Sequence, residues 1–493
     1  MTNQEHFKLY IDGEFVAGGD GQTMHSVNPA NGQVWSSFDC ASKGDIERVV
    51  ASARAALSNP AWAGLTASHR SKLLNKLADL IEQHATELAT IETQDSGKLL
   101  AETTSQTAYV ADYYRYFASL AMTLEGTVIP IDKPDMHVFT SREPIGVVCA
   151  IAPWNAQMFL TATKLGPALA AGCTVIIKAS EIAPCAMLKF AELIDAAGFP
   201  PGVVSVISGD AENCAIPLTS HPDIDRIAFT GGPQTARHVV RNSAENFAVT
   251  SLELGGKSPI MVFADADLES AANGVIAGNF GASGQSCVAG SRVLIQRSIF
   301  TDMLAMLKDK CAAIEVGDPL DERTHIGPVC TAEQVSLAQQ TLAKSIEEGA
   351  QIHAGGQALD LNGGHYFQPT IVECPSPAIS AFNTEFFAPV MSLLAFDDEA
   401  DAISIANDNK YGLASGLFTR DLARAHRVSS KIRAGICYVN TYRAISPLAP
   451  FGGFKDSGYG REAGSEALLD YTRTRTTWVN LSDDPMTNPF VMR

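Results

Sequence analysis

The sequence predicts an α/β fold with two doubly wound parallel-sheet domains and a small β-rich extension. Short β-rich runs alternate with helical patterns between residues 143 and 256, and a second alternating series begins near residue 257. The chain has 493 residues, which is too long for one hydrophobic core. We therefore expect two or three domains.

The first part of the chain reads as helical and then turns to strands. Residues 45–120 carry apolar side chains at every third or fourth position, which predicts helices. The stretch 123–143 is richer in Thr, Val, Ile and Pro and reads as strands that leave the first domain. The terminal run 470–480 alternates like a strand, and we expect it to pair with that stretch, in the same subunit or in another.

The alternating series defines the order of strands and helices. Helical patterns such as AMLKFAELIDAAG and PQTARHVVRNSAEN separate the β-rich runs, and this spacing predicts parallel strands with crossover helices. The predicted strands of the two series lie in EPIGVVCAIAPWN (143–155), CTVIIKAS (173–180), GVVSVIS (202–208), DRIAFTG (225–231), VTSLELGG (249–256), RVLIQRS (292–298) and GICYVN (435–440).

Composition excludes several classes of function. The formal net charge is −18, with 54 acidic against 36 basic residues and no long basic tract, so a nucleic-acid partner is not expected. The first residues lack a signal-peptide layout and the longest apolar stretch, 165–177, is too short to span a bilayer, so we expect a cytoplasmic protein without membrane contact. Ten cysteines without a CxxC pair are expected to be thiols, and no metal site is predicted.

Three residues are candidates for catalysis. Cys287 stands between two glycine-flanked turns, at a joint where reactive side chains are often presented, although an inert thiol is the alternative. Glu253 ends an apolar strand before Gly-Gly; if buried, it has a raised pKa and can act as a general base, and otherwise it is a surface charge. Asn155 follows a strand and is either a donor to an oxyanion or a turn residue.

The sequence lacks the usual GxGxxG nucleotide fingerprint, and SLELGGKS fails as a phosphate loop because Ser251 replaces its first glycine. In IAFTGGPQTARHVV, Gly231 and Gly232 precede a helix whose N-terminus can receive a diphosphate, an ordinary turn being the alternative. Lys178 and Glu181 end another strand, where open α/β sheets bind ligands.

Six motifs occur together in one order: PWN (153–155), FTGG (229–232), ELGGKSP (253–259), GQSC (284–287), TEFFAPV (384–390) and PFGGFKDSGYGRE (450–462). In order and spacing the chain resembles the aldehyde dehydrogenase superfamily over nearly its whole length. The resemblance implies a dinucleotide-binding domain (1–122 and 143–254), a catalytic domain (255–456) and an oligomerisation flap (123–142 and 470–493). It also implies a homodimer or a homotetramer.

The resemblance assigns the chemistry to five residues. Cys287 is the nucleophile that attacks the aldehyde, and Asn155 with the Cys287 N–H holds the oxyanion. Hydride passes to a nicotinamide, and Glu253 activates the water that hydrolyses the remaining thioester. Lys164 and Glu462 match positions that relay protons to this glutamate.

The resemblance also implies NAD as the cofactor, with NADP as the alternative. Glu181 favours NAD because its charge repels a 2′-phosphate. Ala179 replaces the usual proline, which loosens a turn without removing a contact. Gly232 replaces a serine whose hydroxyl can meet phosphate, and this change weakens the expected cofactor affinity. The cofactor-binding residues implied are Ile151, Pro153, Trp154, Lys178, Ser180, Glu181, Gly231, Gly232, Leu254, Glu385 and Phe387.

The substrate pocket departs from the family. Thr163 stands where a large aromatic is common, which predicts a wider and more polar tunnel for a bulky, polar or acidic semialdehyde. Arg443 is a candidate partner for an anionic or carbonyl-bearing tail, a solvated loop arginine being the alternative. The pocket residues expected are Ala156, Gln157, Leu160, Thr163, Ser286, Val288, Arg443 and Ile445.

Three rival functions remain. Acyl transfer to coenzyme A is disfavoured, because enzymes of that kind typically lack the glutamate found at Glu253. A thiol esterase would use Cys287, Asn155 and Glu253 without a nicotinamide. A non-catalytic protein that kept the fold is disfavoured because neither Cys287 nor Glu253 is lost.

Overall fold

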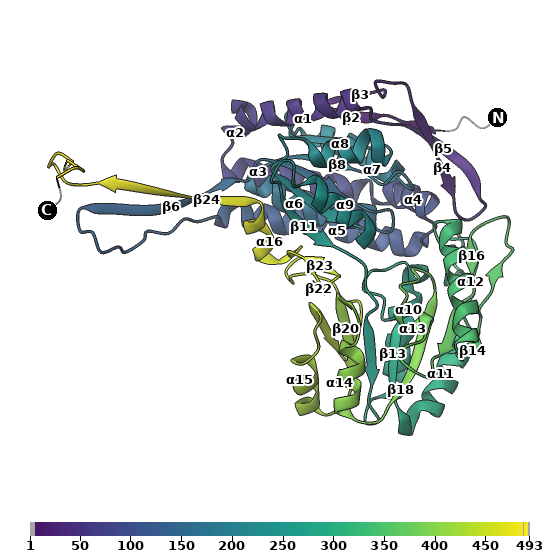
Figure 1. The fold of residues 1–493 in the computed structure, drawn as a ribbon. Coiled ribbons are helices and arrows are strands. Elements are labelled where there is room, and N and C mark those ends of the chain that lie inside the picture. Colours follow the sequence, from purple (N-terminus) through teal and green to yellow (C-terminus); the bar gives the residue numbers. More distant parts are fainter. Residues whose placement is uncertain (1–4, 487, 492–493) are drawn as a thin grey trace.

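The computed structural model describes residues 5–486 and 488–491, so the predicted domain extents that reach 1–4, 487 and 492–493 run outside the described residues. Two large sheets form two lobes, one above the other, and a two-stranded ribbon extends from the upper lobe (Figure 1). Among the described residues no helix has the length and apolar character needed to cross a membrane. The α/β fold class with parallel sheets is confirmed.

The upper lobe is built on an eight-stranded sheet. Its five central strands pair in parallel, and short antiparallel strands close both edges. Its strand order is β23 (Gly458–Tyr459), β11 (Val249–Glu253), β10 (Arg226–Thr230), β7 (Val147–Ile151), β8 (Thr174–Lys178), β9 (Val204–Ile207), β2 (Leu9–Ile11) and β3 (Glu14–Val16).

The central strands of this sheet are buried on both faces. In β7, Val147 and Cys149 pack into one hydrophobic cluster, whereas Val148 and Ala150 pack into another. Because successive side chains of a strand point to opposite faces, these clusters are the two faces of a doubly wound sheet. One face carries α3 (Ala67–Gln83), α4 (Ala85–Ser96), α5 (Leu100–Leu120), α6 (Gln157–Ala171) and α7 (Cys185–Ala197); the other carries α1 (Lys43–Ser58), α8 (Ile216–Ser220) and α9 (Pro233–Asn242).

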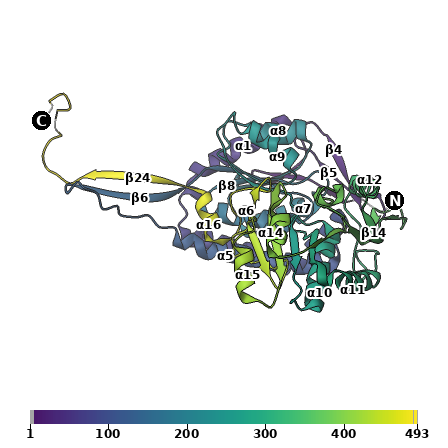
Figure 2. The ribbon, with the colours of Figure 1, turned by 60° about the horizontal axis from the view of Figure 1, so that its bottom comes forward.

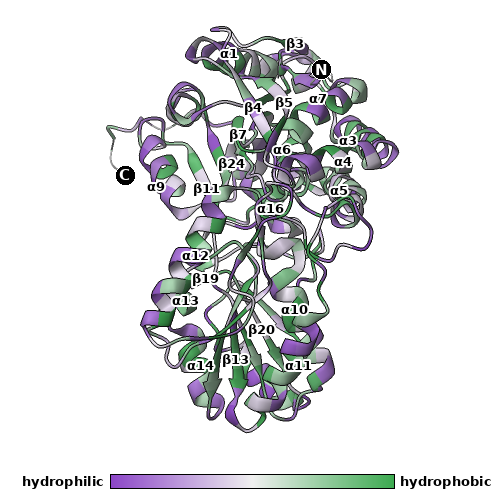
Figure 3. Cartoon of the chain, turned by 90° about the vertical axis from the view of Figure 1, so that its right-hand side faces the viewer, coloured by the Kyte–Doolittle hydropathy of each residue, from purple (hydrophilic) through white to green (hydrophobic). Residues whose placement is uncertain are grey.

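The lower lobe repeats this plan with seven strands, whose apolar interior lies between helices (Figure 3). Five parallel pairings join them, and only the first strand in the order is antiparallel. The order is β14 (Gln351–Ala354), β17 (Thr370–Glu373), β18 (Val390–Phe396), β13 (Arg292–Gln296), β12 (Pro259–Val262), β20 (Ala414–Phe418) and β21 (Ile436–Val439). Helices α10 (Leu268–Phe280) and α11 (Phe300–Ala312) pack on one face, and α12 (Ala332–Glu347), α14 (Glu399–Asn407) and α15 (Leu422–Ser429) on the other.

The ribbon consists of β6 (Met136–Pro144) and β24 (Thr472–Asn480), which pair antiparallel from Thr472 opposite Pro144 to Asn480 opposite Met136. The predicted pairing of the terminal run with the stretch after residue 123 is therefore confirmed, and it occurs within one chain. Figure 2 shows the ribbon projecting clear of both lobes.

The first 44 residues form several strands that were not predicted from the sequence. In addition to β2 and β3, a three-stranded sheet contains β1 (Glu5–Phe7), β5 (Gln33–Asp39) and β4 (Thr23–Asn28). Several of these strands have only three residues, and they mix exposed and buried positions without strict alternation. Such strands carry little periodic signal, which explains why they were not predicted.

A buried arginine connects the second sheet to the loop that follows β11. Arg292 opens β13 and is 1% exposed. Its guanidinium donates to Lys257 O at 2.7 Å, to Ile405 O at 3.0 Å and to Ala406 O at 2.7 Å. The last two carbonyls lie in the final turn of α14, where helix carbonyls lack partners inside the helix. Arg292 therefore acts as the C-terminal cap of α14.

We expect Arg292→Met to lower the free energy of unfolding by about 3 kcal/mol, because it leaves three buried carbonyls without a donor. Arg297→Met is the matched control: Arg297 is exposed and pairs with the exposed Asp397, so its loss should cost less than about 0.5 kcal/mol. Denaturant unfolding of the two variants measures both values. Equal stability of the two variants would show that the cap contributes nothing.

Candidate active site

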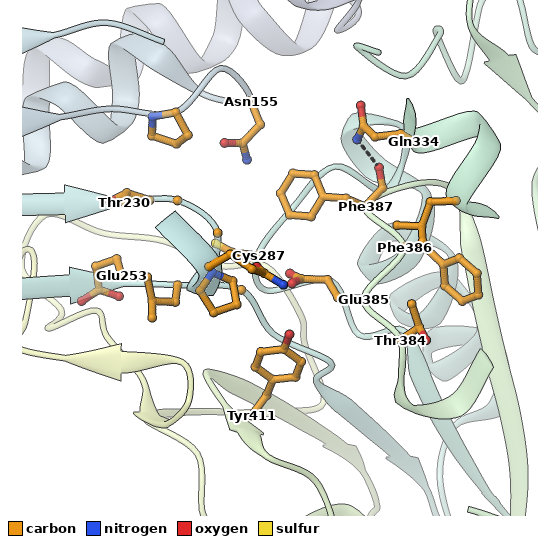
Figure 4. Close-up of a pocket in the computed structure, with 18 of the residues that line it drawn as sticks. Asn155, Thr230, Glu253, Cys287, Gln334, Thr384, Glu385, Phe386, Phe387 and Tyr411 are labelled. Carbon is orange, nitrogen blue, oxygen red and sulfur yellow. Dashed lines mark hydrogen bonds between the residues drawn. The ribbon is translucent and has the colours of Figure 1, made fainter. Parts of the chain in front are cut away.

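A cavity of about 530 Å³ opens where the parallel strands β7, β10 and β11 end (Figure 4). Its lining combines the residues after β7 with Cys287 and the segment 383–387, so both lobes contribute. Ligands of open α/β sheets bind at the carboxyl ends of the strands. This cavity is therefore the candidate active site.

Cys287 is presented by a strained turn. The segment Gly281–Gly284 precedes it, and there Ala282 and Ser283 adopt positive φ values of 54° and 55°. Residues with a side chain rarely adopt this left-handed conformation, so surrounding contacts must hold it. Ser283 Oγ donates to Gly327 O at 2.9 Å, and Ala282 N donates to Glu102 Oε1 at 2.8 Å.

The thiol of Cys287 is protonated at rest. Removal from bulk water, with smaller contributions from the nearby carboxylates of Glu385 and Glu253, raises its pKa to about 12. Since the thiolate is the nucleophilic form, catalysis at this cysteine needs a base or a positive charge brought into the cavity. Both carboxylates line the same cavity as the thiol.

Asn155 lies beside Cys287 in the cavity, and its amide is held in place (Figure 4). Its Nδ2 donates to Gln285 O at 3.0 Å, and Gln285 Oε1 in turn accepts from Cys330 N at 2.7 Å. An amide nitrogen carries two hydrogens, so one remains for a second acceptor. The arrangement fits a fixed donor for an oxyanion formed at Cys287.

Glu253 ends β11 and is 2% exposed. Neither of its carboxylate oxygens has a hydrogen-bond partner among the described residues, and the carboxylate points away from Cys287 in Figure 4. Burial raises its pKa well above the usual value, and the charge of Glu462 raises it further. Such a carboxyl group holds its proton far above the ordinary glutamate range and is suited to exchange it with water.

A buried polar chain lies beside Glu253. Lys164 on α6 forms an ion pair with Glu462 and donates to Thr230 Oγ1 at 2.6 Å. Thr163 Oγ1 donates to the second oxygen of Glu462 at 2.6 Å. Thr230 is the register partner of Glu253 on the neighbouring strand. The structure thus gathers the predicted residues Lys164, Glu462 and Glu253 around one strand end.

On the opposite side of Cys287, Glu385 and Phe387 enter the cavity. Glu385 Oε1 accepts from Gly256 N at 2.9 Å, and burial raises the pKa of this carboxyl to about 7. A Cβ on Gly255 would lie 2.0 Å from Glu385 Oε2, so a larger residue there would displace this carboxylate. The Phe387 ring meets Trp154 edge-on, with centroids 5.5 Å apart.

Gln334 also lines this cavity, and the sequence analysis did not identify it. Its Nε2 donates to Phe387 O at 2.7 Å and fixes a residue whose φ is 54°. Its side chain also caps α12 together with Thr331, so the Thr-x-x-Gln pattern reads as a helix start. Tyr411 and Lys410 were missed as well, because their sequence context carries no motif.

The turn between β10 and α9 forms one wall of the cavity. Gly231 and Gly232 lie in it, and within the described part of the chain no side chain caps the first turn of α9. A Cβ on Gly231 would come within 2.6 Å of the Phe229 ring. An uncapped helix N-terminus at a glycine turn is suited to bind a diphosphate.

The other predicted cofactor residues follow β8 or lie near the cavity. Lys178 and Glu181 form an ion pair at the end of β8, outside the described lining of the cavity. Ser180 Oγ accepts from Ile182 N at 3.3 Å. Pro153 and Leu254 line the cavity, whereas Ile151 ends β7 and is not among the described residues that line it.

Only part of the predicted substrate set borders open space. Leu160, Thr163 and Ile445 line a second cavity of about 110 Å³, and Leu160 also lines the first. Gln157 is fully buried and donates to Trp154 O at 3.5 Å, and Arg443 Nη1 donates to Ala277 O at 3.2 Å. Among the described residues, the linings of these two cavities do not include Ala156, Gln157, Ser286, Val288 or Arg443.

Comparison with known proteins agrees with this geometry. Residues 15–477 match the model of the aldehyde dehydrogenase family. The chain is 53% identical over 490 residues to the (Z)-2-((N-methylformamido)methylene)-5-hydroxybutyrolactone dehydrogenase of Acinetobacter baylyi, with 99% of this chain and 100% of that protein covered.

Solved structures give the same result. The betaine aldehyde dehydrogenase of Staphylococcus aureus in complex with NAD⁺ superposes with a TM-score of 0.96 at 35% identity, covering 98% of this chain and 97% of that one. The NAD⁺ complex of an aldehyde dehydrogenase from Bacillus cereus superposes with a TM-score of 0.95 at 37% identity, covering 97% of each chain.

Proposed function

This chain belongs to the aldehyde dehydrogenase family, and on that premise we propose that it oxidises an aldehyde to the carboxylic acid at Cys287 with NAD as the cofactor. One observation carries the proposal. A single cavity presents Cys287, Asn155 and Glu253 together with Glu385 and the ring of Phe387. The first three supply a nucleophile, an oxyanion donor and a base, and the last two border the space that a nicotinamide needs.

The cavity fits a dinucleotide by its shape and its donors. Its volume of about 530 Å³ lies in the range of small-molecule sites. The turn with Gly231 and Gly232 leaves the N-terminus of α9 open to the diphosphate, and the Glu385 carboxylate can accept hydrogen bonds from a ribose. Glu181 carries the charge that selects NAD over NADP.

The first step is formation of a bond between Cys287 Sγ and the aldehyde carbon. Since the resting thiol has a pKa of about 12, its proton must pass to water as the bond between sulfur and carbon forms. The carbonyl oxygen becomes an oxyanion held by the free hydrogen of the Asn155 amide and by the Cys287 N–H. NAD, when bound, supplies the acceptor for the hydride that leaves this carbon.

The thioester left on Cys287 is then hydrolysed. Glu253 takes a proton from water, hydroxide adds to the acyl carbon, and the Cys287–acyl bond breaks to release the acid. The Lys164 and Glu462 pair, with Thr230, offers a path by which the proton leaves the buried glutamate. This hydrolytic route, supported by the presence of Glu253, distinguishes the proposal from acyl transfer to coenzyme A.

We propose further that the chain assembles into a homodimer or a homotetramer through the β6–β24 ribbon. The ribbon projects from the body and exposes 57% of Trp478 and 62% of the adjacent Leu481 (Figure 2). Exposed apolar side chains on an open strand favour pairing with another chain. A monomeric mass by light scattering at micromolar concentration would contradict this assembly.

The ten cysteines are all free thiols, which supports a location in the reducing cytoplasm. Most of these thiols are buried, so forming disulfide bonds between them would require the chain to rearrange. Cell fractionation that places the protein outside the cytoplasm would contradict this location.

The proposed activity predicts aldehyde-dependent reduction of NAD, seen as growth of the absorbance of reduced nicotinamide. A panel of aliphatic, aromatic and acidic aldehydes, run with NAD and NADP in parallel, measures it. We expect at least one aldehyde to support turnover, with a higher kcat/KM for NAD than for NADP. Ester hydrolysis that is undiminished without cofactor, combined with no NAD reduction by any aldehyde, would support the esterase rival.

A further inference from the structure

The second cavity continues the active site toward the loop 444–451. Leu160 lines both cavities, and Cys287, Ile436 and Phe451 pack against the cluster that contains Tyr438. Burial raises the pKa of Tyr438 to about 12, and the adjacent Cys287 contributes to this shift. Leu160 therefore connects the cavity that holds Cys287 with a second cavity that can receive the far end of a bound aldehyde.

No basic side chain lines the second cavity among the described residues. Its one ionisable carboxylate is Glu462, whose oxygens already accept from Lys164 and Thr163. Arg443, which the sequence associated with an anionic tail, donates to Ala277 O. An anionic group in the cavity would be buried without a counter-charge and close to a carboxylate, which is strongly unfavourable.

The cavity nevertheless offers hydrogen-bond donors. Tyr113 lines it, and no hydrogen bond of its hydroxyl is recorded among the described residues. Ser446 Oγ accepts from Leu448 N at 3.2 Å and keeps its own hydrogen free to donate. The Tyr438 hydroxyl, in contrast, already donates to Ala444 O at 2.9 Å. Two free donors fit a neutral acceptor such as a carbonyl oxygen.

The size and walls of the cavity limit the shape of its occupant. Its volume is about 110 Å³, less than the roughly 150 Å³ of a cavity that holds one benzene ring, so it takes the far edge of a ring whose aldehyde end lies in the first cavity. The rings of Tyr113 and Phe159 meet edge-on with centroids 5.0 Å apart, and Phe451 lies on the same lining. Aromatic walls favour a planar ring over a flexible chain.

We infer that the preferred substrate is an uncharged aldehyde with a single planar ring and a carbonyl group on its far side, which accepts a hydrogen bond from Tyr113. The inference rests on the proposed function and specifies its substrate class. Of the bulky, polar or acidic semialdehydes expected from the sequence, it departs from the acidic one, because the Arg443 side chain donates to a backbone carbonyl.

The test compares para-formylbenzamide with para-formylbenzoate, which have nearly the same shape and differ in charge. We expect kcat/KM for the amide to exceed that for the carboxylate by at least about tenfold, which corresponds to roughly 1.4 kcal/mol. A carboxylate that is used as well as the amide, or better, would overturn the inference.

Two pairs of variants test the residues. Tyr113→Phe should lower kcat/KM for para-formylbenzamide several-fold relative to kcat/KM for benzaldehyde, whereas Tyr116→Phe, at a partly exposed tyrosine on the same helix, should leave this ratio unchanged. Ser446→Arg should improve para-formylbenzoate relative to the amide, whereas Leu448→Arg, 66% exposed on the same loop, should not. An unchanged amide-to-carboxylate ratio in Ser446→Arg would show that the cavity is not where the ring end binds.

Binding separates this inference from the proposed function. Calorimetric titration of the Cys287→Ala variant with each compound reports recognition without turnover, and we expect the amide to bind about tenfold more tightly. If wild-type protein reduces no NAD but the binding preference persists, the proposed chemistry fails and the ring site stands. If NAD is reduced but both compounds bind equally, the chemistry stands and the inference fails.

Discussion

Replacing Cys287 by alanine is expected to lower kcat for aldehyde oxidation by a factor on the order of 10⁶, because it removes the atom that carries the substrate through both steps. The cavity around Cys287 offers no second thiol: the other partly exposed cysteine, Cys437, is not among the described residues that line it. Alanine leaves the strained turn at Ala282 and Ser283 in place, since that turn is held by its own contacts. The folded protein should therefore survive the change.

The measurement is the rate of NAD reduction with the best aldehyde of the panel, in wild-type protein, Cys287→Ala and the control Cys437→Ala. We expect the control to retain wild-type rates, because Cys437 packs against the core of the lower lobe. Thermal unfolding of all three proteins shows whether the fold is intact. A folded Cys287→Ala variant with more than about one hundredth of wild-type activity would rule out this cysteine as the nucleophile.

Much of the fold follows from the sequence because parallel strands buried on both faces leave a clear pattern. The run that contains β7 places apolar side chains on both faces, and both resulting clusters are present in the structure. The short strands near the N-terminus escaped prediction because half-exposed strands of three residues have no comparable pattern. The pairing of β6 with β24 was predicted from the Thr, Val, Ile and Pro content of residues 123–143 and from the alternation in the terminal run 470–480.

Some residues of the candidate site could be predicted from the sequence, and others could not. Residues in a motif, such as Cys287 and Glu253, were identified because their local sequence is itself the signal. Gln334 was not identified, because its role depends on a hydrogen bond from its side chain to Phe387 O, and Phe387 lies 53 residues further along the chain. The direction of the Arg443 side chain was equally out of reach, since a loop residue with φ of 60° has no sequence pattern to indicate where its side chain turns.

Replacing Glu253 by glutamine is expected to slow hydrolysis of the thioester by about 10²- to 10⁴-fold, the usual contribution of a general base. The change keeps the shape of the side chain but removes its capacity to take a proton from water. Because the residue sits beside Lys164 and Glu462 but hydrogen-bonds to no described residue, glutamine breaks no existing hydrogen bond. The first turnover should still release reduced nicotinamide if proton removal from Cys287 remains faster than hydrolysis.

The measurement is a rapid-mixing experiment followed by intact mass. We expect a burst of about one reduced nicotinamide per site, then a slow steady rate, with an acyl group retained on Cys287. Glu466→Gln is the matched control, since Glu466 is exposed on the short helix α16 (Gly464–Asp470) and should show wild-type kinetics. If Glu253→Gln shows neither a burst nor a trapped acyl group, Glu253 acts before hydride transfer. If the variant has the wild-type steady rate, Glu253 is not the base for hydrolysis.

The pH dependence of these two proteins supplies a second and independent criterion. The pKa of Glu253 is raised well above its usual value by burial and by Glu462, so the wild-type hydrolysis rate should rise with pH above the ordinary glutamate range, and this rise should vanish in Glu253→Gln. The same pKa shift affects stability, because the folded protein binds this proton more tightly than the unfolded chain does. The contribution of Glu253 to the free energy of unfolding therefore falls as pH rises above the unfolded pKa.

We expect Glu253→Gln to have a free energy of unfolding equal to or greater than that of wild type at neutral pH, and equal to it in acid. If Glu253 only supported the fold, the variant would be less stable than wild type at both pH values.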